Sequence, residues 1–428
     1  MTAAAEPIGA LLRRRWRDPA AWMDTADIFA ALLALSLPWS TSLVAIFAVV
    51  LVLVMLPTIN AGAFISSLKR PICAAPIALF ALALVGTLWS DAHWGLRLYA
   101  VAPTAKLLLL PLLFYHFERS QRGLWVLAAF LVSCTALLAM SWIVLFFPDL
   151  TLKARGVGVD SPGIFVKNYI DQSQEFALCA VALAFPIATL LRAKKNVLAL
   201  LLGALALGFL ANMAFVIVSR TALVTIPIML AVFALLHLRW QTTLMILCAA
   251  VVAGLVAWAA SPLLQEKVGS ISSEYHLYVE QGAKTSVGER LEFWRKSLRF
   301  FVEAPVAGHG TGSTEGLFEQ AAAGQTGIAA EVVRNPHNQT LNVAIQWGAL
   351  GIVVLYAMWL SHLWLFRGEG LFNWIGLLVV VQNVFTSLFN SHLFDFHEGW
   401  MYVLGVGVAG GIVLKASGTV SAHAPGAS

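Results

Sequence analysis

The residue with the clearest chemical meaning is an arginine inside an apolar stretch. Arg220 interrupts the run 213–236, which is otherwise almost wholly apolar and long enough to cross a bilayer. An arginine within a lipid-spanning segment costs at least about 2.5 kcal/mol unless it meets water or an anion. Counted from the start of the run, it would lie roughly 10 Å deep, at the floor of a cavity open to one membrane face. The alternative is that its side chain extends back to the interface.

A second arginine falls at the start of a helix within a polar segment. Ser286-Val287-Gly288-Glu289 has the form of a capping box, with Ser286 as N-cap and Glu289 at N3. Apolar residues at helical spacing then predict a helix over about 287–303. Arg290 lies in its first turn, where the free amides and the guanidinium would together hold an anion. The alternative is a solvated or glutamate-paired arginine.

A histidine marks the entrance to a later apolar run. Asn335 as N-cap and Pro336 at N1 would start a helix, with His337 in its first turn. The positive end of the helix dipole disfavours an imidazolium there, so we expect a neutral side chain able to accept a proton. A polar stripe follows, which must face protein or water, at Asn338, Asn342 and Gln346. The alternative for the histidine is a hydrogen-bonding anchor at the membrane interface.

Polar residues also gather between the last two apolar runs. This segment contains His392, Asp395, His397 and Glu398, whose spacing fits no tight tetrahedral metal site. We therefore predict no metal. Asp395 or Glu398 would instead orient His337 or line its cavity.

Two glycine-containing turns carry weaker signals. In 308–313, three alternating glycines would allow backbone amides to approach a phosphate, but the pattern matches no phosphate-binding fingerprint and favours a plain turn. Lys153 and Arg155 flank another such turn. They would contact a charged or sugar ligand, although solvation in an outer loop explains them nearly as well.

The composition restricts the class of protein. Of 428 residues, 60% are hydrophobic and only 11% are charged, which indicates an all-α polytopic membrane protein rather than a soluble one. The formal net charge of +5 is compatible with anionic partners. Nucleic acid is excluded as a partner because the sequence contains no soluble basic module to bind it.

Apolar runs predict about twelve transmembrane helices. They lie near 26–40, 41–59, 72–89, 98–116, 123–147, 174–191, 195–211, 213–236, 242–260, 339–365, 371–389 and 399–415. Helices 1–9 occupy 26–260 and helices 10–12 occupy 339–416. The longest polar segment, 261–338, would form a small subdomain.

Basic residues in the short loops set the orientation. Arg13–Arg17, Lys69, Arg119, Arg192 and Lys415 fall on one side, which the positive-inside rule makes cytoplasmic. Both termini, with the N-terminal segment 1–25 and a flexible tail over 417–428, then lie inside. The loop 148–173 and the large loop 261–338 lie on the periplasmic side.

Four short motifs follow one another between residues 213 and 350. They are Ser219-Arg220-Thr221-Ala222, Gly288-Glu289-Arg290-Leu291 with Trp294 downstream, Pro305-Val306-Ala307-Gly308-His309-Gly310, and His337-Asn338-Gln339-Thr340-Leu341 with Trp347-Gly348. With the large loop between late spans, their order resembles the bacterial O-antigen ligase family. Because each motif is short and degenerate, the resemblance depends on order and topology.

The resemblance implies a fold similar to the all-helical transmembrane (GT-C-like) glycosyltransferases. It also implies transfer of O-antigen glycan from undecaprenyl pyrophosphate to a lipid A–core sugar, at the periplasmic face of the inner membrane. The reaction would be metal-independent and inverting, with no cofactor and with membrane lipids as neighbours. The family's two essential arginines match Arg220 and Arg290, as ligands of the pyrophosphate, and its essential histidine matches His337, as general base. Asn338, Asn342 and Asp395, with Lys153 and Arg155, are expected in a secondary part of the cavity.

Other activities remain open from the sequence. O-antigen polymerases and protein O-oligosaccharyltransferases share much of the pattern and would use nearly the same residues. A transporter or flippase is the non-enzymatic alternative, since charged residues at depth mark ion paths. Against it, the sequence lacks repeated halves and paired broken helices.

Overall fold

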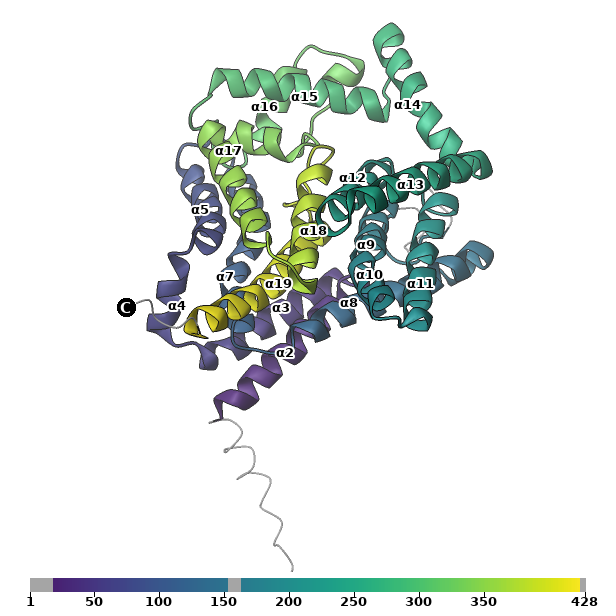
Figure 1. Cartoon of the computed structure of the whole chain (residues 1–428). Coiled ribbons are helices and arrows are strands. Elements are labelled where there is room, and N and C mark those ends of the chain that lie inside the picture. Colours follow the sequence, from purple (N-terminus) through teal and green to yellow (C-terminus); the bar gives the residue numbers. More distant parts are fainter. Residues whose placement is uncertain (1–17, 153–162, 424–428) are drawn as a thin grey trace, which may run out of the picture.

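A computed structural model describes residues 18–152 and 163–423 of the chain. The described residues form helices and no strands, so the predicted all-α fold is confirmed. Figure 1 shows a bundle of long helices with a layer of helices above it. The first residues of α2 and the end of α19 lie in the lower half of that view, away from this layer.

Ten helical segments among the described residues are long and apolar enough to cross a membrane, rather than twelve. They comprise α3 (Thr41–Met55, with a 3-10 turn to Thr58), α5 (Pro71–Val85, with a turn to Leu88), α6 (Trp94–Ala105) continued by α7 (Leu109–Phe117), α8 (Gly123–Phe146), α9 (Tyr169–Ala182) continued by α10 (Ala184–Arg192), α11 (Asn196–Phe215), α12 (Arg220–His237), α13 (Trp240–Ala260), α17 (Gln339–Leu365) and α19 (Phe396–His423).

The other two predicted spans are also helices but do not meet that criterion. They are α2 (Pro19–Ser36), which contains Asp24 and Asp27, and α18 (Leu371–Thr386), which is shorter. A short helix α4 (Ala61–Leu68) joins α3 to α5. At the C-terminus, α19 continues to His423, into the segment predicted as a flexible tail from residue 417.

The centre of the bundle forms where α19 packs along α7 and α18, and where α17 packs along α5. Trp347, Trp374 and Tyr402 are among the largest fully buried side chains. Close helix approach depends on small residues. A Cβ at Gly407 would lie 2.6 Å from Leu113 of α7, and one at Gly405 would lie 2.7 Å from Val379 of α18.

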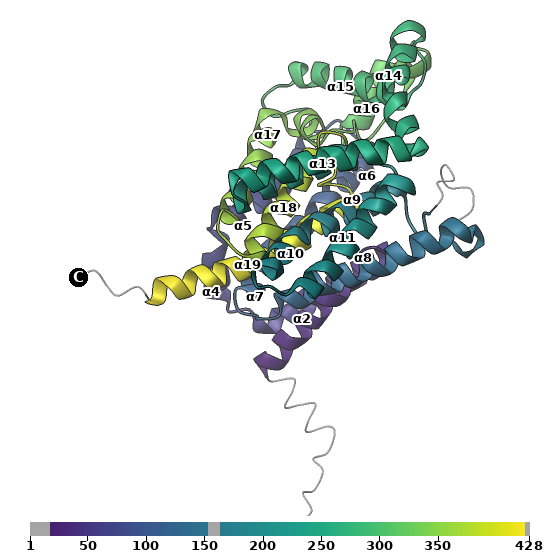
Figure 2. The ribbon, with the colours of Figure 1, turned by 45° about the vertical axis from the view of Figure 1, so that its right-hand side comes forward.

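The large loop contains more helix than the single one predicted. It comprises α14 (Pro262–Gln281), α15 (Ser286–Glu303) and α16 (Thr314–Ala322), followed by a 3-10 turn over Gly327–Ala330. We call α14, α15 and α16 the outer layer; Figures 1 and 2 show them together at one end of the bundle. A small apolar cluster joins this layer to α17 through Phe293, Phe300, Phe318 and Ile345.

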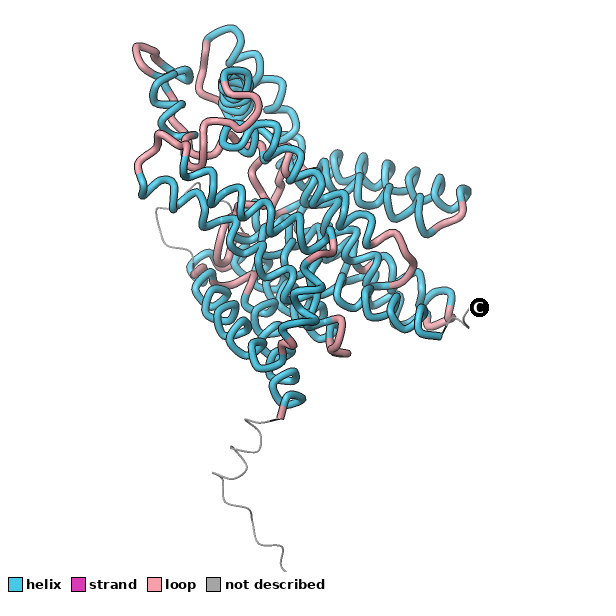
Figure 3. Tube along the Cα trace, turned by 90° about the vertical axis from the view of Figure 1, so that its left-hand side faces the viewer, coloured by secondary structure: helices cyan, strands magenta, loops and turns pink. Residues whose placement is uncertain are grey.

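Two breaks in long helices affect the candidate site. Figure 3 shows the helices and the loops that join them. The predicted span 213–236 corresponds to α12, but its predicted start is wrong, because α11 ends at Phe215 and α12 begins at Arg220. The intervening Val216 and Ile217 pack against Ile164 in a small apolar cluster. A buried apolar linker has the same hydropathy as a helix, and the sequence pattern cannot distinguish the two.

The second break lies inside α17, where Gly348 has φ 58° and ψ −150°. The chain 305–310 lies against this break: His309 N donates to Ile345 O at 2.8 Å, and Ala349 N donates to Pro305 O at 2.8 Å. A Cβ on Gly308 would come within 2.5 Å of the Gln346 backbone. The glycines of 308–313 therefore permit close packing of this segment against the backbone of α17, which neither the plain-turn nor the phosphate-binding interpretation predicted.

Candidate active site

Helix α15 is the element that connects the predicted site residues. It begins because Thr285, rather than Ser286 as predicted, is the N-cap: its Oγ1 accepts from Gly288 N at 3.1 Å. A second free amide, Val287 N, donates to Glu274 Oε2 at 3.1 Å. The start of α15 therefore already binds a carboxylate, as the positive end of a helix dipole favours.

Arg220 lies at the first position of α12, not seven residues inside a span. Its guanidinium forms a two-pronged ion pair with Glu274, with Nη1 donating to Oε2 at 3.2 Å and Nη2 to Oε1. Nη2 also donates to Ser270 Oγ at 2.6 Å, and Nε donates to Lys267 O at 3.1 Å. The hydrogen bond from Arg220 lowers the pKa of Glu274. The Glu274 carboxylate thus joins Arg220 to the start of α15.

Arg290 lies about one turn after the start of α15. Its Nη1 donates to Ser286 Oγ at 2.9 Å, and its Nε is buried with no partner among the described residues. Burial lowers the pKa of Arg290, and the positive charge of Arg220 lowers it further. A half-buried guanidinium whose buried Nε–H is unmet would be stabilised by an anion.

His337 does not lie in the first turn of a helix, as predicted, because α17 begins at Gln339 with Asn338 as N-cap. It occupies a left-handed backbone conformation (φ 54°), and its N–H donates to Asn335 Oδ1 at 3.0 Å. The ring stacks on Phe293 of α15 with centroids 6.2 Å apart. Burial, together with the charge of Arg290, lowers the pKa of His337. The expected neutral state therefore follows from burial rather than from a helix dipole.

Asn390 fixes the tautomer of His337. Its Oδ1 lies 2.9 Å from His337 Nδ1, and its Nδ2 donates to Asp395 Oδ2 at 2.7 Å. Asn335 Nδ2 also donates to Asn390 Oδ1 at 2.9 Å. Because Oδ1 can only accept, Nδ1 of the imidazole carries the proton and Nε2 presents a lone pair. The sequence interpretation gave Asn390 no role, although it stands five residues before Asp395 in the same polar segment.

The polar stripe on α17 faces protein and a cavity. Asn338 Nδ2 donates to Leu388 O at 3.1 Å, and Asn342 Nδ2 donates to Ser391 Oγ at 3.0 Å. Gln346 Nε2 donates to Asn342 Oδ1 at 2.9 Å, while its Oε1 accepts from Gly312 N at 2.8 Å. These bonds hold the amides in fixed orientations.

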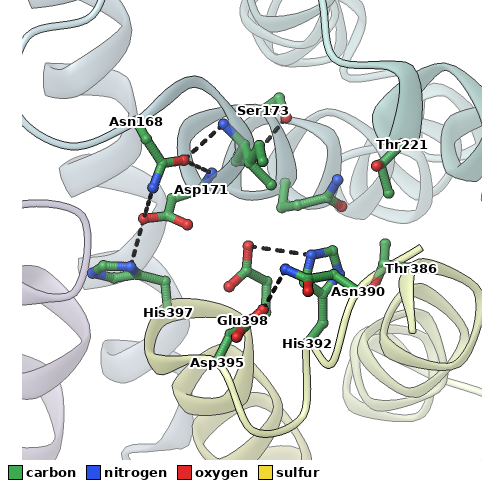
Figure 4. Close-up of polar contacts among 12 residues, drawn as sticks. Asn168, Asp171, Ser173, Thr221, Thr386, Asn390, His392, Asp395, His397 and Glu398 are labelled. Carbon is green, nitrogen blue, oxygen red and sulfur yellow. Dashed lines mark hydrogen bonds and ion pairs between the residues drawn. The ribbon is translucent and has the colours of Figure 1, made fainter. Parts of the chain in front are cut away.

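Two polar cavities share Asp395. The first, of about 260 Å³, is lined by α6, the start of α16, Asn335, Asn342 and Gln346. The second, of about 340 Å³, is lined by Asn390 itself, by Asn168 and Asp171 at the start of α9, and by the start of α19. Figure 4 shows these latter residues pointing toward one another across the second cavity.

The polar segment before α19 forms pairs rather than a metal centre. His397 Nδ1 lies 2.6 Å from Asp171 Oδ2, and His392 Nε2 lies 3.9 Å from Glu398 Oε1, as drawn in Figure 4. Burial lowers the pKa of His392 to about 4. Within 18–152 and 163–423, no group of three or more His, Cys, Asp or Glu side chains is placed to hold a metal ion.

The structure thus brings most of the candidate residues around one helix and one loop. Arg290 belongs to α15, and Arg220 is joined to the start of this helix through Glu274. His337 contacts the same helix, because Trp294 Nε1 donates to His337 O at 3.4 Å. Asn338 and Asn342 follow His337 at the start of α17, and Asp395 is linked to His337 through Asn390. Lys153 and Arg155 lie outside the described residues.

Residues 205–356 match the sequence profile of the family described as O-antigen ligase. Over this segment, the chain is similar to the O-antigen ligase family. The resemblance predicted from the motifs is confirmed over this range, which contains Arg220, Arg290 and His337. Asn390 and Asp395 lie beyond it. Together with the ten apolar helices found among the described residues, this similarity makes the chain a multi-pass membrane protein.

A curated relative extends the comparison only slightly. A protein of Haemophilus influenzae, described as uncharacterized, is 25% identical over 154 residues, which cover 35% of this chain and 39% of the relative. The chain therefore spans well under half of the length of this relative.

Proposed function

We propose that this protein is an inner-membrane glycosyltransferase of the O-antigen ligase family. It transfers O-antigen glycan from undecaprenyl pyrophosphate to a sugar of the lipid A–core, on the periplasmic side. The observation that carries the proposal is the arrangement around α15, where Arg220 is joined through Glu274 to the helix start and His337 contacts Trp294 on the same helix.

The leaving group in this reaction is pyrophosphate, which gains negative charge as the bond from sugar C1 to its oxygen breaks. Arg220 and Arg290 supply positive charge, and α15 supplies free amides, for those oxygens. The proposal requires the diphosphate to displace Glu274, which takes the same donors of Arg220 and Val287. The buried Nε of Arg290 then gains an acceptor.

His337 activates the acceptor. Its Nε2 takes the proton of the acceptor hydroxyl while that oxygen forms the new bond to C1 from the face opposite the leaving group, so the anomeric configuration inverts. Asn390 holds the imidazole by Nδ1, and Asp395 holds Asn390. The products are the glycosylated acceptor, undecaprenyl pyrophosphate and a proton on His337, which returns to solvent. No step in this scheme needs a metal ion.

The orientation follows from the same scheme. With the outer layer and His337 on the periplasmic side, the basic short loops and both termini are cytoplasmic, as the positive-inside rule predicts. The donor, the acceptor and the surrounding membrane lipids then reach the site from one leaflet.

The test is reconstitution of the purified protein with lipid-linked glycan and rough lipopolysaccharide. A ladder of glycan-bearing lipopolysaccharide on a gel is the expected result. Longer chains on the donor lipid, with bare lipopolysaccharide, would mean an O-antigen polymerase. Transfer to an added pilin-type protein instead would mean a protein O-oligosaccharyltransferase. Movement of the donor across sealed vesicles without transfer would mean a transporter, and each of these outcomes would overturn the ligase proposal.

A further inference from the structure

The cavity of about 260 Å³ beside α17 has walls suited to one kind of ligand. Most of its polar groups are neutral amides and hydroxyls: Asn335, Asn342, Gln346, Ser391 and Thr314. Two aromatic side chains, Tyr99 of α6 and Phe394, also line it, and Tyr99 is 62% exposed. Neutral amides with one exposed aromatic ring recognise hydroxyl-rich rings, through hydrogen bonds and contact with the ring face.

The charges of the cavity argue against an anionic ligand. Among the described residues that line it, Arg334 is the one cation, and it is already paired with Glu315, with Nε donating to Oε2 at 2.8 Å. The Asp395 carboxylate also faces the cavity. A diphosphate would meet two carboxylates here and only one cation, whereas the region of Arg220 and Arg290 offers it two guanidinium groups. This cavity is therefore unsuited to the pyrophosphate.

One buried hydroxyl in the cavity has no partner. Thr314, at the start of α16, is 3% exposed, and its Oγ1 forms no hydrogen bond with any described residue. A buried hydroxyl left in that state costs free energy, and a ligand hydroxyl would satisfy it. Thr314 is thus a second, independent sign that the cavity takes a polar ligand.

The cavity is also connected to the proposed base. Asn335 lines it and donates to Asn390 Oδ1 at 2.9 Å, the atom that accepts from His337. Asp395 lines it and accepts from Asn390 Nδ2 at 2.7 Å. The second cavity lies by contrast at the starts of α9 and α19.

We propose that the cavity formed by Tyr99, Thr314, Asn335, Asn342 and Gln346 binds the saccharide of the acceptor, and presents its hydroxyl to His337. This inference rests on the proposed glycosyl transfer for its meaning, but it concerns a binding site that is testable without any transfer.

The decisive variant is Thr314→Val, which replaces the unpartnered hydroxyl by a methyl group of similar size. Because that hydroxyl bonds to no described residue, the melting temperature should not fall. The acceptor KM should rise about threefold to tenfold, the equivalent of one neutral hydrogen bond. The donor KM and kcat at saturating acceptor should stay unchanged. Thr314→Ser, which keeps the hydroxyl, should restore the acceptor KM.

Thr326→Val is the matched control, because Thr326 lies exposed in the same loop and outside the cavity. It should change neither KM. A rise in the donor KM of Thr314→Val would assign the cavity to the donor glycan and overturn the proposal. An unchanged acceptor KM would overturn it as well.

Direct binding separates this inference from the proposed function. The probe is core oligosaccharide released from rough lipopolysaccharide by mild acid, titrated calorimetrically into the purified protein without donor. Binding that weakens in Thr314→Val but not in Thr326→Val supports the cavity, even if no transfer activity is found and the proposed function fails. Absence of binding to the wild-type protein, or equal binding to both variants, refutes it.

Discussion

Glu274→Gln tests whether the anion site at the start of α15 is occupied by the protein's own carboxylate. Glu274 accepts from both terminal nitrogens of Arg220 and from Val287 N. Those are donors that the mechanism assigns to the pyrophosphate. Glutamine has the same shape and keeps one acceptor oxygen but carries no charge. We therefore expect the variant to bind a diphosphate more tightly than the wild-type protein.

The magnitude follows from the exposure of the pair. The side chains of Arg220 and Glu274 are 26% and 20% exposed, so solvent screens them and the pair contributes at most about 1 kcal/mol, the upper end for such pairs. Since 1.4 kcal/mol corresponds to a factor of ten, displacing the carboxylate weakens diphosphate binding by about fivefold. Glu274→Gln should therefore bind the diphosphate about fivefold more tightly than the wild-type protein.

The pH dependence has a defined sign. Arg220 lowers the pKa of Glu274 below its ordinary value of 4.5, so the ion pair is complete above that value and is lost only as the pH falls through the lowered pKa. The difference between the variant and the wild-type protein should therefore be constant at neutral pH and disappear only in strong acid.

The assay is calorimetric titration of a water-soluble isoprenyl diphosphate into detergent-purified protein. Glu303→Gln is the control, because Glu303 forms an exposed ion pair with Arg299 on the same helix at 2.8 Å. It should leave the affinity unchanged. Weaker binding by Glu274→Gln would refute the reasoning, because it would mean that Glu274 mainly holds Arg220 in position for the ligand.

The remaining predictions concern catalysis, pH, metals and the helix break. His337→Ala should lower kcat by about 10² to 10⁴, the range for a general base, while the protein still accumulates in the membrane; undiminished glycan attachment would remove His337 from the mechanism. Burial lowers the pKa of His337 below 6.5, so kcat/KM should be flat through neutral pH and fall with an acid limb below pH 6.5; a limb above it would contradict the assignment. Activity should persist after exhaustive dialysis against EDTA, and a loss restored by magnesium would reassign the pyrophosphate role to a metal. Gly348→Ala should destabilise the protein severely, because its φ of 58° is strained for alanine and the new Cβ would lie 2.5 Å from Val306; Gly316→Ala, which meets no atom within 4 Å, is the control, and equal melting temperatures would show that the break tolerates a side chain.

The helices could be predicted from the sequence far better than their ends. Hydropathy identifies apolar runs, and each of the twelve runs contains or overlaps a helix. It cannot show where an apolar chain leaves the helix, as at Val216 before α12, because a linker buried in protein is as apolar as a span. The helix α14 was missed for the opposite reason: within the described chain only Leu264 of this helix is buried, so it lacks a marked apolar stripe.

In the candidate site, the sequence indicates which residues could do chemistry but not which residues contact them. Arg290 and His337 are conspicuous by type and position, and the sequence alone singled them out. Their partners are not, because each is distant in the chain: Asn390 lies 53 residues from His337, and Glu274 lies 54 residues from Arg220. Only the fold pairs them, although the polar segment that contains Asn390 and Asp395 stands out between two apolar helices.

The cost of placing a cation at a membrane helix accounts for both members of the Arg220–Glu274 pair. An arginine at the start of α12 needs a countercharge, since an unpaired guanidinium there is expensive, and it also stands at the positive end of a helix dipole, which opposes it. Glu274 supplies that countercharge and at the same time satisfies a free amide of α15. A diphosphate can replace the carboxylate in both contacts, and Arg290 adds a further cation. The carboxylate that stabilises Arg220 in the fold is therefore the group that the diphosphate of the donor replaces. The affinity for the donor then depends on how much more strongly these cations and amides bind the diphosphate than the Glu274 carboxylate, and not on the arginines alone.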